Sequence, residues 1–237
     1  MGFTIPARRP ALIPALIALI ALAIAVVGWM HWRSHSGATT PPATPVAASG
    51  YDHARKLLDG LPIKGWDRHT DFSRYRFGEP WSDDVDVEFG HNGCNTRDDI
   101  LRRDLAELVV RPHTCYAQSG VLHDPYTGES VPFVRGPATS DAVQIDHLVS
   151  LSDAWYKGAR EWDERRRRDF ANDPRNLLAV GGKANFDKAF RDAAGWLPPN
   201  TAYRCEFVAR QVEVKSAYRL WVSAKEKQAM ADVLDRC

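Results

Sequence analysis

An uncharged apolar run near the N-terminus decides how much of this chain can belong to a folded domain. Residues 11–30 are twenty consecutive residues without a charge, and Arg8 and Arg9 precede them. A helix of this length can cross a hydrocarbon core of ~30 Å, and the preceding positive charges favour a cytoplasmic N-terminus. We therefore expect residues 1–35 to be a transmembrane signal anchor. A cleaved signal peptide is the alternative, although its apolar region is typically only about 7–15 residues long.

The segment after this run cannot build a core. Residues 36–50 read SGATTPPATPVAASG, and such a mixture of prolines and small residues is typical of a linker. We expect one folded domain at residues 51–237, which is long enough for a single sizeable core. This domain would lie outside the cytoplasm, anchored to the membrane by the N-terminal helix, or secreted if that segment is cleaved.

The charge of the folded part is nearly balanced. The chain has 31 basic and 30 acidic residues, and its first fifty residues contribute three arginines and no acid. Tight non-specific binding of nucleic acid depends on many contacts of Lys and Arg with phosphates. The composition therefore excludes a domain that binds nucleic acid through overall positive charge, but it is compatible with a local basic surface.

The cysteines agree with export. Cys94, Cys115, Cys205 and Cys237 all follow the apolar run, and an even number of cysteines in an exported domain is typical of disulfides. Of the three pairings that four cysteines allow, we expect Cys94–Cys115 and Cys205–Cys237, because each closes a local loop within its own half of the domain. The connectivity stays open at this point. A zinc site is the competing interpretation, but it favours ligands at C-x2–4-C spacing, and no two cysteines are that close.

The apolar pattern of residues 51–237 predicts an α+β fold that is mostly helical, with a few short strands. We expect a helix over residues 95–110, with Asn95 or Thr96 as its N-cap. Two extended segments follow at residues 115–124 and 130–136, separated by the turn DPYTG. After Leu151 helical patterns dominate; they cover residues 151–159, 161–173, 183–195 and two long segments that run to Cys237.

Two titratable side chains stand together in the otherwise mostly apolar segment VQIDHLV, residues 143–149. Asp146 and His147 would point to opposite sides of a regular strand, so they can serve one site only if the strand ends or bulges there. Further along, Asn176 precedes the apolar residues LLAV.

A helix downstream can complete such a site. Asn185 and Lys188 are three residues apart and hence lie on one helix face. We expect a β-hairpin covered by this helix, with a hard metal ion between them, because carboxylate and amide oxygens suit Mg²⁺. A histidine with a pKa near ~6.5 can take a proton from water at neutral pH.

Together these segments resemble the HNH endonucleases of the ββα-metal class, and in particular an exported HNH family similar to the GmrSD C-terminal domain. The resemblance extends from about Tyr75 to Cys237. It is carried by VQIDHLVSLSDAWYKGA, FANDPRNLLAV, Asn185, Lys188 and WLPP, together with NGCNTRDDILRRDL and DPYTG. Its fold implication is an α+β domain, mostly helical, around a ββα-metal core with short antiparallel strands.

The resemblance also implies a role for each site residue. Asp146 and Asn185 would be metal ligands, His147 the general base, Asn176 the residue that holds the histidine loop by hydrogen bonding, and Lys188 a contact to the scissile phosphate. The cofactor would be a divalent metal, Mg²⁺ or alternatively Mn²⁺. One departure from the family pattern is Ser150, where a proline is usual; it removes no catalytic group.

The implied function is metal-dependent hydrolysis of phosphodiester bonds by an endonuclease. The partner would be nucleic acid, DNA in preference to RNA, with low sequence specificity because such a site contacts the backbone. Two alternatives stand beside this function. Asp146 and His147 can be a hydrogen-bonded structural pair. The domain can also be an inactive module that binds nucleic acid or a wall polymer at the cell surface, although none of the matching positions is lost.

Overall fold

The computed structural model describes residues 50–67 and 71–237. The expected anchor, residues 1–35, lies outside the described residues, as does nearly all of the linker at residues 36–50. Within the described ranges, no helix is long and apolar enough to cross a membrane.

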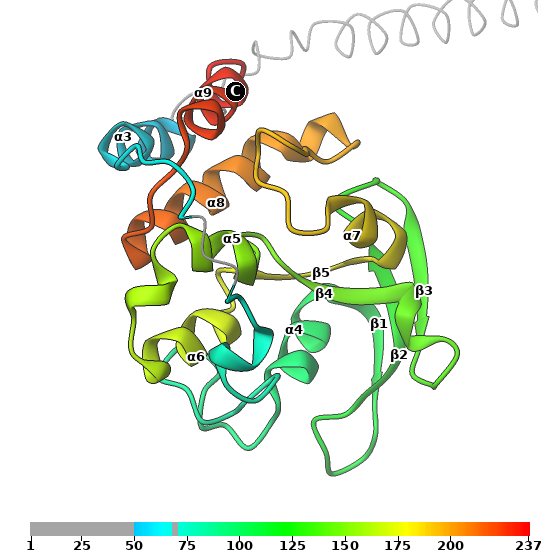
Figure 1. The fold of residues 1–237 in the computed structure, drawn as a ribbon. Coiled ribbons are helices and arrows are strands. Elements are labelled where there is room, and N and C mark those ends of the chain that lie inside the picture. Colours follow the sequence, from blue (N-terminus) through cyan, green and yellow to red (C-terminus); the bar gives the residue numbers. More distant parts are fainter. Residues whose placement is uncertain (1–49, 68–70) are drawn as a thin grey trace, which may run out of the picture. The chain divides into compact units, whose positions relative to one another are not determined.

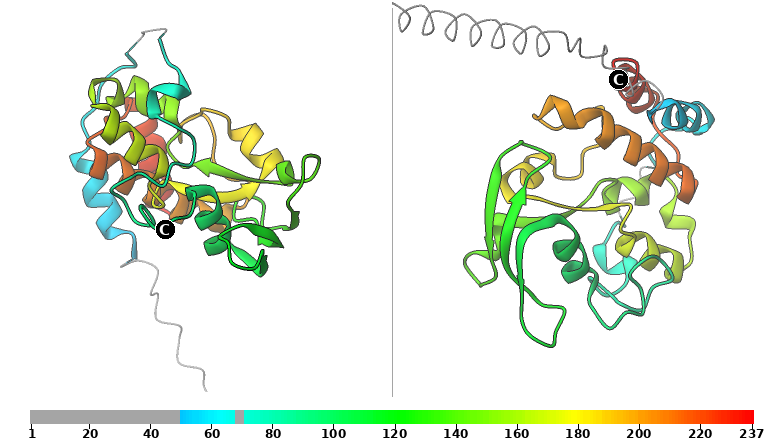
Figure 2. Two further views of the ribbon diagram at one scale, coloured as in Figure 1. Left: turned by 90° about the horizontal axis from the view of Figure 1, so that it is seen from below. Right: turned by 180° about the vertical axis from the view of Figure 1, so that it is seen from behind.

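The described helices and strands form an α+β fold with two separate antiparallel sheets, as the sequence predicts (Figure 1). Three helices, α3 (Asp52–Gly60), α8 (Arg204–Tyr218) and α9 (Ala224–Leu234), pack on one another. Figure 2 shows this helical group on one side of the domain and the three-stranded sheet on the other. Further helical segments are α5 (Leu151–Tyr156), α6 (Glu164–Asn172) and the short 3-10 turns η1 (Arg74–Phe77), η2 (Ser140–Ala142), η3 (Ala159–Glu161) and η4 (Thr201–Tyr203).

The helix expected over residues 95–110 is half as long as predicted. Helix α4 covers Thr96–Asp104, and the Asn95 side chain caps it by accepting a hydrogen bond from the Asp98 backbone N–H. The prediction was wrong for the residues that follow, because Leu105–Val110 is strand β1 and pairs with β2 (Ala117–His123). β-branched residues such as Val109 and Val110 favour a strand once a partner strand is present, and a short apolar run cannot reveal that partner.

Strand β3 (Ser130–Val134) completes the three-stranded sheet in the order β1-β2-β3. The predicted turn DPYTG joins β2 to β3, and its backbone is closed by a hydrogen bond from the Gly128 N–H to the Asp124 carbonyl. Gly128 has a φ of 80°, which a residue with a side chain rarely adopts. The turn thereby brings Tyr126 into the apolar core, where it is fully buried.

The second sheet carries the residues of interest. Strand β4 (Val143–His147) pairs with β5 (Leu177–Gly181), and helix α7 (Gly182–Lys188) follows at once and packs on both strands. Every residue of β5 is buried because its two faces meet different cores: Leu178 and Val180 pack with α8, whereas Leu177 and Ala179 pack with the other sheet. This ββα unit is the predicted core. Helix α7 ends at Lys188, before Ala189 with its φ of 52°, and so is shorter than the expected 183–195.

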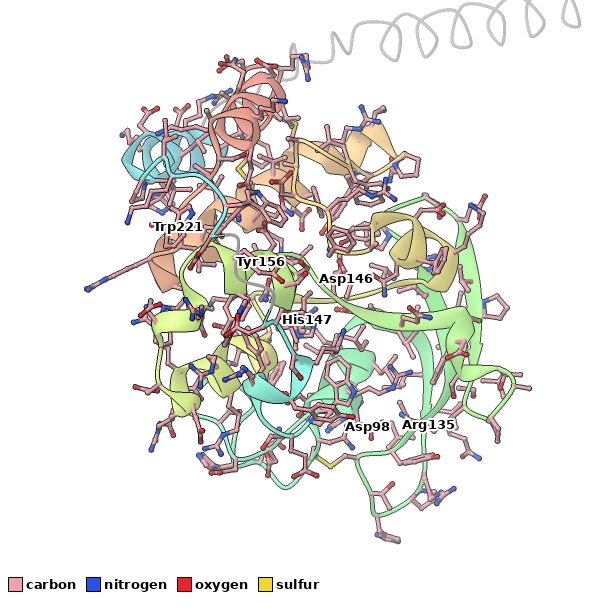
Figure 3. All side chains as sticks on the ribbon, viewed as in Figure 1. Asp98, Arg135, Asp146, His147, Tyr156 and Trp221 are labelled. Atoms are coloured by element: carbon pink, nitrogen blue, oxygen red, sulfur yellow. A yellow bond between two sulfur atoms is a disulfide. The ribbon has the colours of Figure 1, made fainter. Side chains whose placement is uncertain are left out.

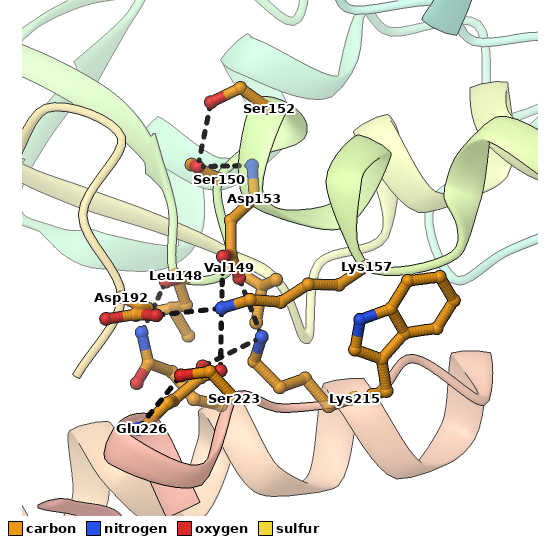
Figure 4. Close-up of polar contacts among 12 residues, drawn as sticks. Leu148, Val149, Ser150, Ser152, Asp153, Lys157, Asp192, Lys215, Ser223 and Glu226 are labelled. Carbon is orange, nitrogen blue, oxygen red and sulfur yellow. Dashed lines mark hydrogen bonds and ion pairs between the residues drawn. The ribbon is translucent and has the colours of Figure 1, made fainter. Parts of the chain in front are cut away.

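Five charged side chains, four of them buried and one partly buried, lie between α5, α8 and α9 (Figure 4). We call them the lysine–carboxylate cluster; it consists of Asp153, Lys157, Asp192, Lys215 and Glu226. The Lys157 ammonium lies 2.8 Å from Asp192 and 2.6 Å from Glu226, and the Lys215 ammonium lies 2.6 Å from Asp153 and 2.9 Å from Glu226. Three carboxylates therefore share two ammonium groups. The contacts of Lys215 link α8 to both α5 and α9, and the contact of Lys157 with Glu226 links the end of α5 to α9.

Both disulfides join the cysteines that the sequence analysis paired. Cys94 bonds to Cys115 and Cys205 bonds to Cys237, with Cα–Cα distances of 5.6 and 5.9 Å. The first ties the start of α4 to the loop between β1 and β2. The second ties the start of α8 to the end of the chain.

Removing the second disulfide should destabilise the domain measurably. Replacing Cys205 and Cys237 together by serine should lower the free energy of unfolding by about 2–5 kcal/mol, because the unfolded chain regains the freedom of the loop that the bond closes. Urea unfolding of the oxidised wild type and the variant measures the difference. Peptide mapping without reductant is the control; free thiols or crossed linkages in the wild type would contradict the pairing.

Candidate active site

His147 ends strand β4 and is almost fully buried. Its Nε2 lies 2.8 Å from the backbone carbonyl oxygen of Ala171, at the end of α6. A carbonyl oxygen can only accept, so Nε2 carries the proton and Nδ1 of a neutral imidazole keeps a free lone pair. The ring of Trp81 lies nearly parallel to the imidazole, with 6.0 Å between ring centroids. The contacts thus fix both the tautomer and the plane of the ring.

The surroundings of His147 favour its neutral form. Burial lowers the pKa of His147 to about 3, and the positive charges of Arg74 and Lys188 act in the same direction, whereas the bond to Ala171 opposes them. A neutral imidazole is the form that can accept a proton.

Asp146 lies next to His147 (Figure 3) and is buried. Two donors hold its carboxylate. The hydroxyl of Tyr126 donates to Oδ2 at 2.5 Å, and the ammonium of Lys188 donates to Oδ1 at 3.0 Å. Burial raises the pKa of Asp146, while Lys188 and Tyr126 oppose that rise. Burial and the neighbouring carboxylate also raise the pKa of Tyr126, which keeps this hydroxyl a donor.

Lys188 is placed differently from what the sequence suggested. It lies on α7 as expected, but its side chain is fully buried, and its ammonium also donates to the backbone carbonyl of His147 at 2.8 Å. An ammonium that is enclosed by Asp146 and this carbonyl does not present its charge to an open pocket. The sequence predicts that Lys188 contacts a phosphate. In the structure its ammonium instead orients the Asp146 carboxylate.

Asn176 holds the chain just after His147, where the sequence analysis placed it. Its side-chain oxygen accepts from the Val149 N–H at 2.8 Å, its side-chain N–H donates to the Val149 carbonyl at 3.2 Å, and its own carbonyl accepts from the Leu148 N–H at 2.8 Å. Ser150, the departure from the family pattern, caps α5 by accepting from the Asp153 N–H. A serine in this place thus has a structural use of its own.

Asn185 projects from α7 toward the same strand. Its side-chain N–H donates to Oε1 of Gln144 at 2.8 Å, which fixes the amide with its oxygen, Oδ1, free of any hydrogen bond to a described residue. Asn185, Asp146 and His147 all line one pocket of about 330 Å³. Strand alternation would separate Asp146 from His147, but β4 ends at His147, and both reach this pocket.

The residues that line this pocket fit a hard divalent cation. No group of three or more His, Cys, Asp or Glu side chains with metal-ligand spacing occurs among residues 50–67 and 71–237. Mg²⁺ does not need one, because it keeps several waters and takes one or two carboxylate ligands. Asp146 accepts two hydrogen bonds at about four lone-pair sites, so it retains capacity for a cation beside the free amide oxygen of Asn185.

Sequence reasoning missed three residues of the site. Tyr126 was assigned only to the turn DPYTG, yet it donates to Asp146. Trp81 and Arg74 belong to a segment that reads as an irregular loop, yet Trp81 stacks on His147 and Arg74 lines the pocket. A tyrosine inside a turn motif was the one available signal, since turn positions rarely favour a large buried ring.

Comparison with known proteins defines the class to which this fold and site belong. Residues 95–233 match the family described as the C-terminal domain of GmrSD restriction endonucleases, which is more than half of the chain. An uncharacterized secreted protein of Arthroderma benhamiae is 36% identical over 200 residues, which cover 84% of this chain and 89% of that relative. No solved structure matches. The chain belongs to the GmrSD C-terminal domain family, and the resemblance drawn from the sequence motifs is confirmed.

Proposed function

We propose that this protein is a metal-dependent endonuclease that hydrolyses phosphodiester bonds of DNA with low sequence specificity. One observation carries the proposal: a histidine whose tautomer is fixed by the Ala171 carbonyl shares a pocket with the side-chain oxygens of Asp146 and Asn185. A general base and a cation site side by side are the two groups that hydrolysis of a phosphodiester needs. Membership in a restriction-endonuclease family supports the same reaction.

Each residue has a part in this reaction. His147 takes a proton at Nδ1 from a water molecule, whose oxygen attacks phosphorus in line with the leaving 3′ oxygen. The bond from phosphorus to that oxygen breaks, the departing oxygen takes a proton from solvent water, and the products are a 5′-phosphate and a 3′-hydroxyl. Asp146 and Asn185 would hold a divalent ion, Mg²⁺ or Mn²⁺, which when bound supplies positive charge to the phosphate oxygens.

Three further residues keep the site in order. Lys188 and Tyr126 orient the Asp146 carboxylate, and they leave its remaining lone pairs for the cation. Asn176 fixes the chain that follows His147. These contacts hold the base and the ligands before a substrate arrives, and such preorganisation is a large part of how a site lowers a reaction barrier.

Loss of the metal should abolish cleavage. Conversion of supercoiled plasmid to nicked and linear forms by the full chain should stop in excess chelator and return when Mg²⁺ or Mn²⁺ is added back. Asp146→Ala and Asn185→Ala should weaken metal binding, measured by calorimetry, and part of their lost rate should return at high metal concentration. Gln144→Ala, which removes only the partner of the Asn185 amide, is the matched control and should keep more activity than either.

Two results would contradict the proposed reaction. Cleavage that is unaffected by chelator would remove the metal from the mechanism. Tight binding of DNA without cleavage under any metal would favour the inactive surface module instead. The two results are distinct, because the first leaves a nuclease and the second leaves a binding protein.

We also propose that the domain acts outside the cytoplasm. Two disulfides are typical of an oxidising compartment, and the Arthroderma benhamiae relative is described as secreted. Both the membrane anchor and the cleaved signal peptide remain compatible with this location. The mass of the mature protein in cell fractions distinguishes the two.

A further inference from the structure

A second pocket, of about 310 Å³, opens beside His147 and is distinct from the one that contains Asp146 and Asn185. We call it the aromatic pocket. Residues 74–81 form one wall of it, including Tyr75, Pro80 and Trp81, and His147 forms part of another. His147 and Arg74 line both pockets. The wall formed by residues 74–81 precedes residues 95–233, the part of the chain that matches the family.

The segment that carries this wall is firmly held. Phe77 is buried, and its ring packs against the rings of Trp155 and Phe170. The Arg167 side chain donates a hydrogen bond to the Arg76 carbonyl at 2.7 Å. Gly78, with a φ of 84°, lies against the Arg168 side chain, where a Cβ would come within 3.2 Å of it. The pocket wall is therefore already formed, which lowers the entropy that binding a ligand would cost.

Tyr75 is 86% exposed on this rigid turn, at the rim of the aromatic pocket. A single exposed ring is ordinary on a protein surface. Here, however, the ring is continuous with an apolar pocket that ends at the proposed general base. A volume of about 310 Å³ is at the lower end of the range for ligand pockets, about 300–1,000 Å³, and so suits a small planar group.

Arg74 supplies a charge between the two pockets. Its side chain is exposed and forms no hydrogen bond or ion pair with another described residue, whereas Arg165 and Arg168 on the neighbouring helix α6 pair with aspartates. An unpaired guanidinium at this position complements a phosphate, with which arginine forms bidentate hydrogen bonds.

We propose that the aromatic pocket receives one unpaired nucleobase next to the scissile phosphate, that Arg74 contacts this phosphate, and that the preferred substrate is therefore a single strand. The inference rests on the proposed nuclease function. A base in a duplex is stacked and paired, and so cannot enter an apolar pocket without leaving the helix. A single strand presents its bases freely, and base stacking on aromatic side chains is the usual way in which proteins hold one.

Binding measured in chelator, where the full chain cannot cut, tests the pocket separately from the chemistry. Fluorescence anisotropy compares three DNA probes: a short single strand, a hairpin duplex of equal length, and the single strand with its bases removed. Tyr75→Ala should weaken binding of the intact single strand by about 5- to 150-fold, the equivalent of 1–3 kcal/mol for one stacked base. The duplex and the strand without bases should be unaffected. Tyr75→Phe keeps the ring and should bind like the wild type.

Arg74→Ala should weaken binding of the intact strand and the strand without bases alike, because both keep their phosphates. The slope of the logarithm of the binding constant against the logarithm of the salt concentration should decrease in magnitude by about one, because one phosphate contact is lost. Arg111→Ala is the matched control, since Arg111 is also exposed but lies at the end of β1, stacked on Tyr116. It should leave binding unchanged.

Equal affinity for duplex and single strand, or an equal loss for all three probes in Tyr75→Ala, would overturn the inference and leave the proposed function intact. Conversely, single-strand binding that depends on Tyr75 in a protein that cuts no nucleic acid with any metal would support the pocket and overturn the proposed hydrolysis.

Discussion

His147→Ala should reduce the rate of DNA cleavage by about 10²- to 10⁴-fold, because it removes the group that takes a proton from the attacking water. Asp146 and Asn185 remain, so metal affinity should change little. Initial rates of plasmid nicking, together with calorimetric titration of Mg²⁺, measure both quantities. His123→Ala, which replaces an exposed histidine on β2, is the control and should cleave at the wild-type rate.

The burial of His147 requires a second variant. Truncation to alanine leaves the Ala171 carbonyl without its donor, and an unpaired buried acceptor costs about 1–3 kcal/mol. His147→Gln retains an amide N–H for this carbonyl but cannot accept a proton in the way an imidazole does. It should be more stable than His147→Ala in thermal unfolding and equally inactive. Full activity in either variant would make Asp146 and His147 a structural pair.

Lys157→Met should lower the free energy of unfolding by about 3–5 kcal/mol, the cost of removing one partner from a buried ion pair. Lys157 is fully buried and contacts Asp153, Asp192 and Glu226, so its loss leaves three carboxylates with Lys215 alone (Figure 4). Urea unfolding at neutral pH measures the change. Lys183→Met is the matched control: this lysine is 88% exposed and pairs with Asp187 four residues on, so the change should be under about 0.5 kcal/mol.

A second substitution separates charge from packing. Burial raises the pKa of Glu226, and the neighbouring carboxylates of Asp153 and Asp192 act in the same direction, whereas Lys215 and Lys157 oppose that rise. Glu226→Gln added to Lys157→Met should therefore recover part of the lost stability, because it removes one uncompensated charge. If the double variant is no more stable than Lys157→Met, or if Lys157→Met alone costs less than about 1 kcal/mol, the cluster does not hold α5, α8 and α9 together.

Local patterns predicted much of the ββα unit. The apolar run LLAV became β5 because both of its faces are buried, and only a run without polar interruptions can satisfy two cores. Asn185 and Lys188 share a helix, as their spacing requires. The cysteines paired within their own halves because short loops bring their ends together most easily.

Other features depend on partners that are distant in the chain. Leu105–Val110 reads as the end of a helix and becomes a strand because β2 lies beside it. Lys188 reads as a surface cation and becomes a buried partner of Asp146 because α7 packs on β4. Spacing along a helix states which residues share a face, but not what that face meets.

The amino-acid sequence was therefore sufficient for the family and the α+β class, since these follow from motifs and periodicity. It also favoured the disulfide pairing that the structure has, and it singled out Asp146, His147 and Asn185, which line one pocket. Tertiary packing alone decided which nitrogen of His147 is free, because the Ala171 carbonyl that fixes it belongs to α6. It also brought Tyr126 to Asp146 and the segment of Arg74 and Tyr75 to His147. These contacts join residues twenty to more than seventy positions apart, and such pairings are set by how elements pack on one another and not by any pattern within one element.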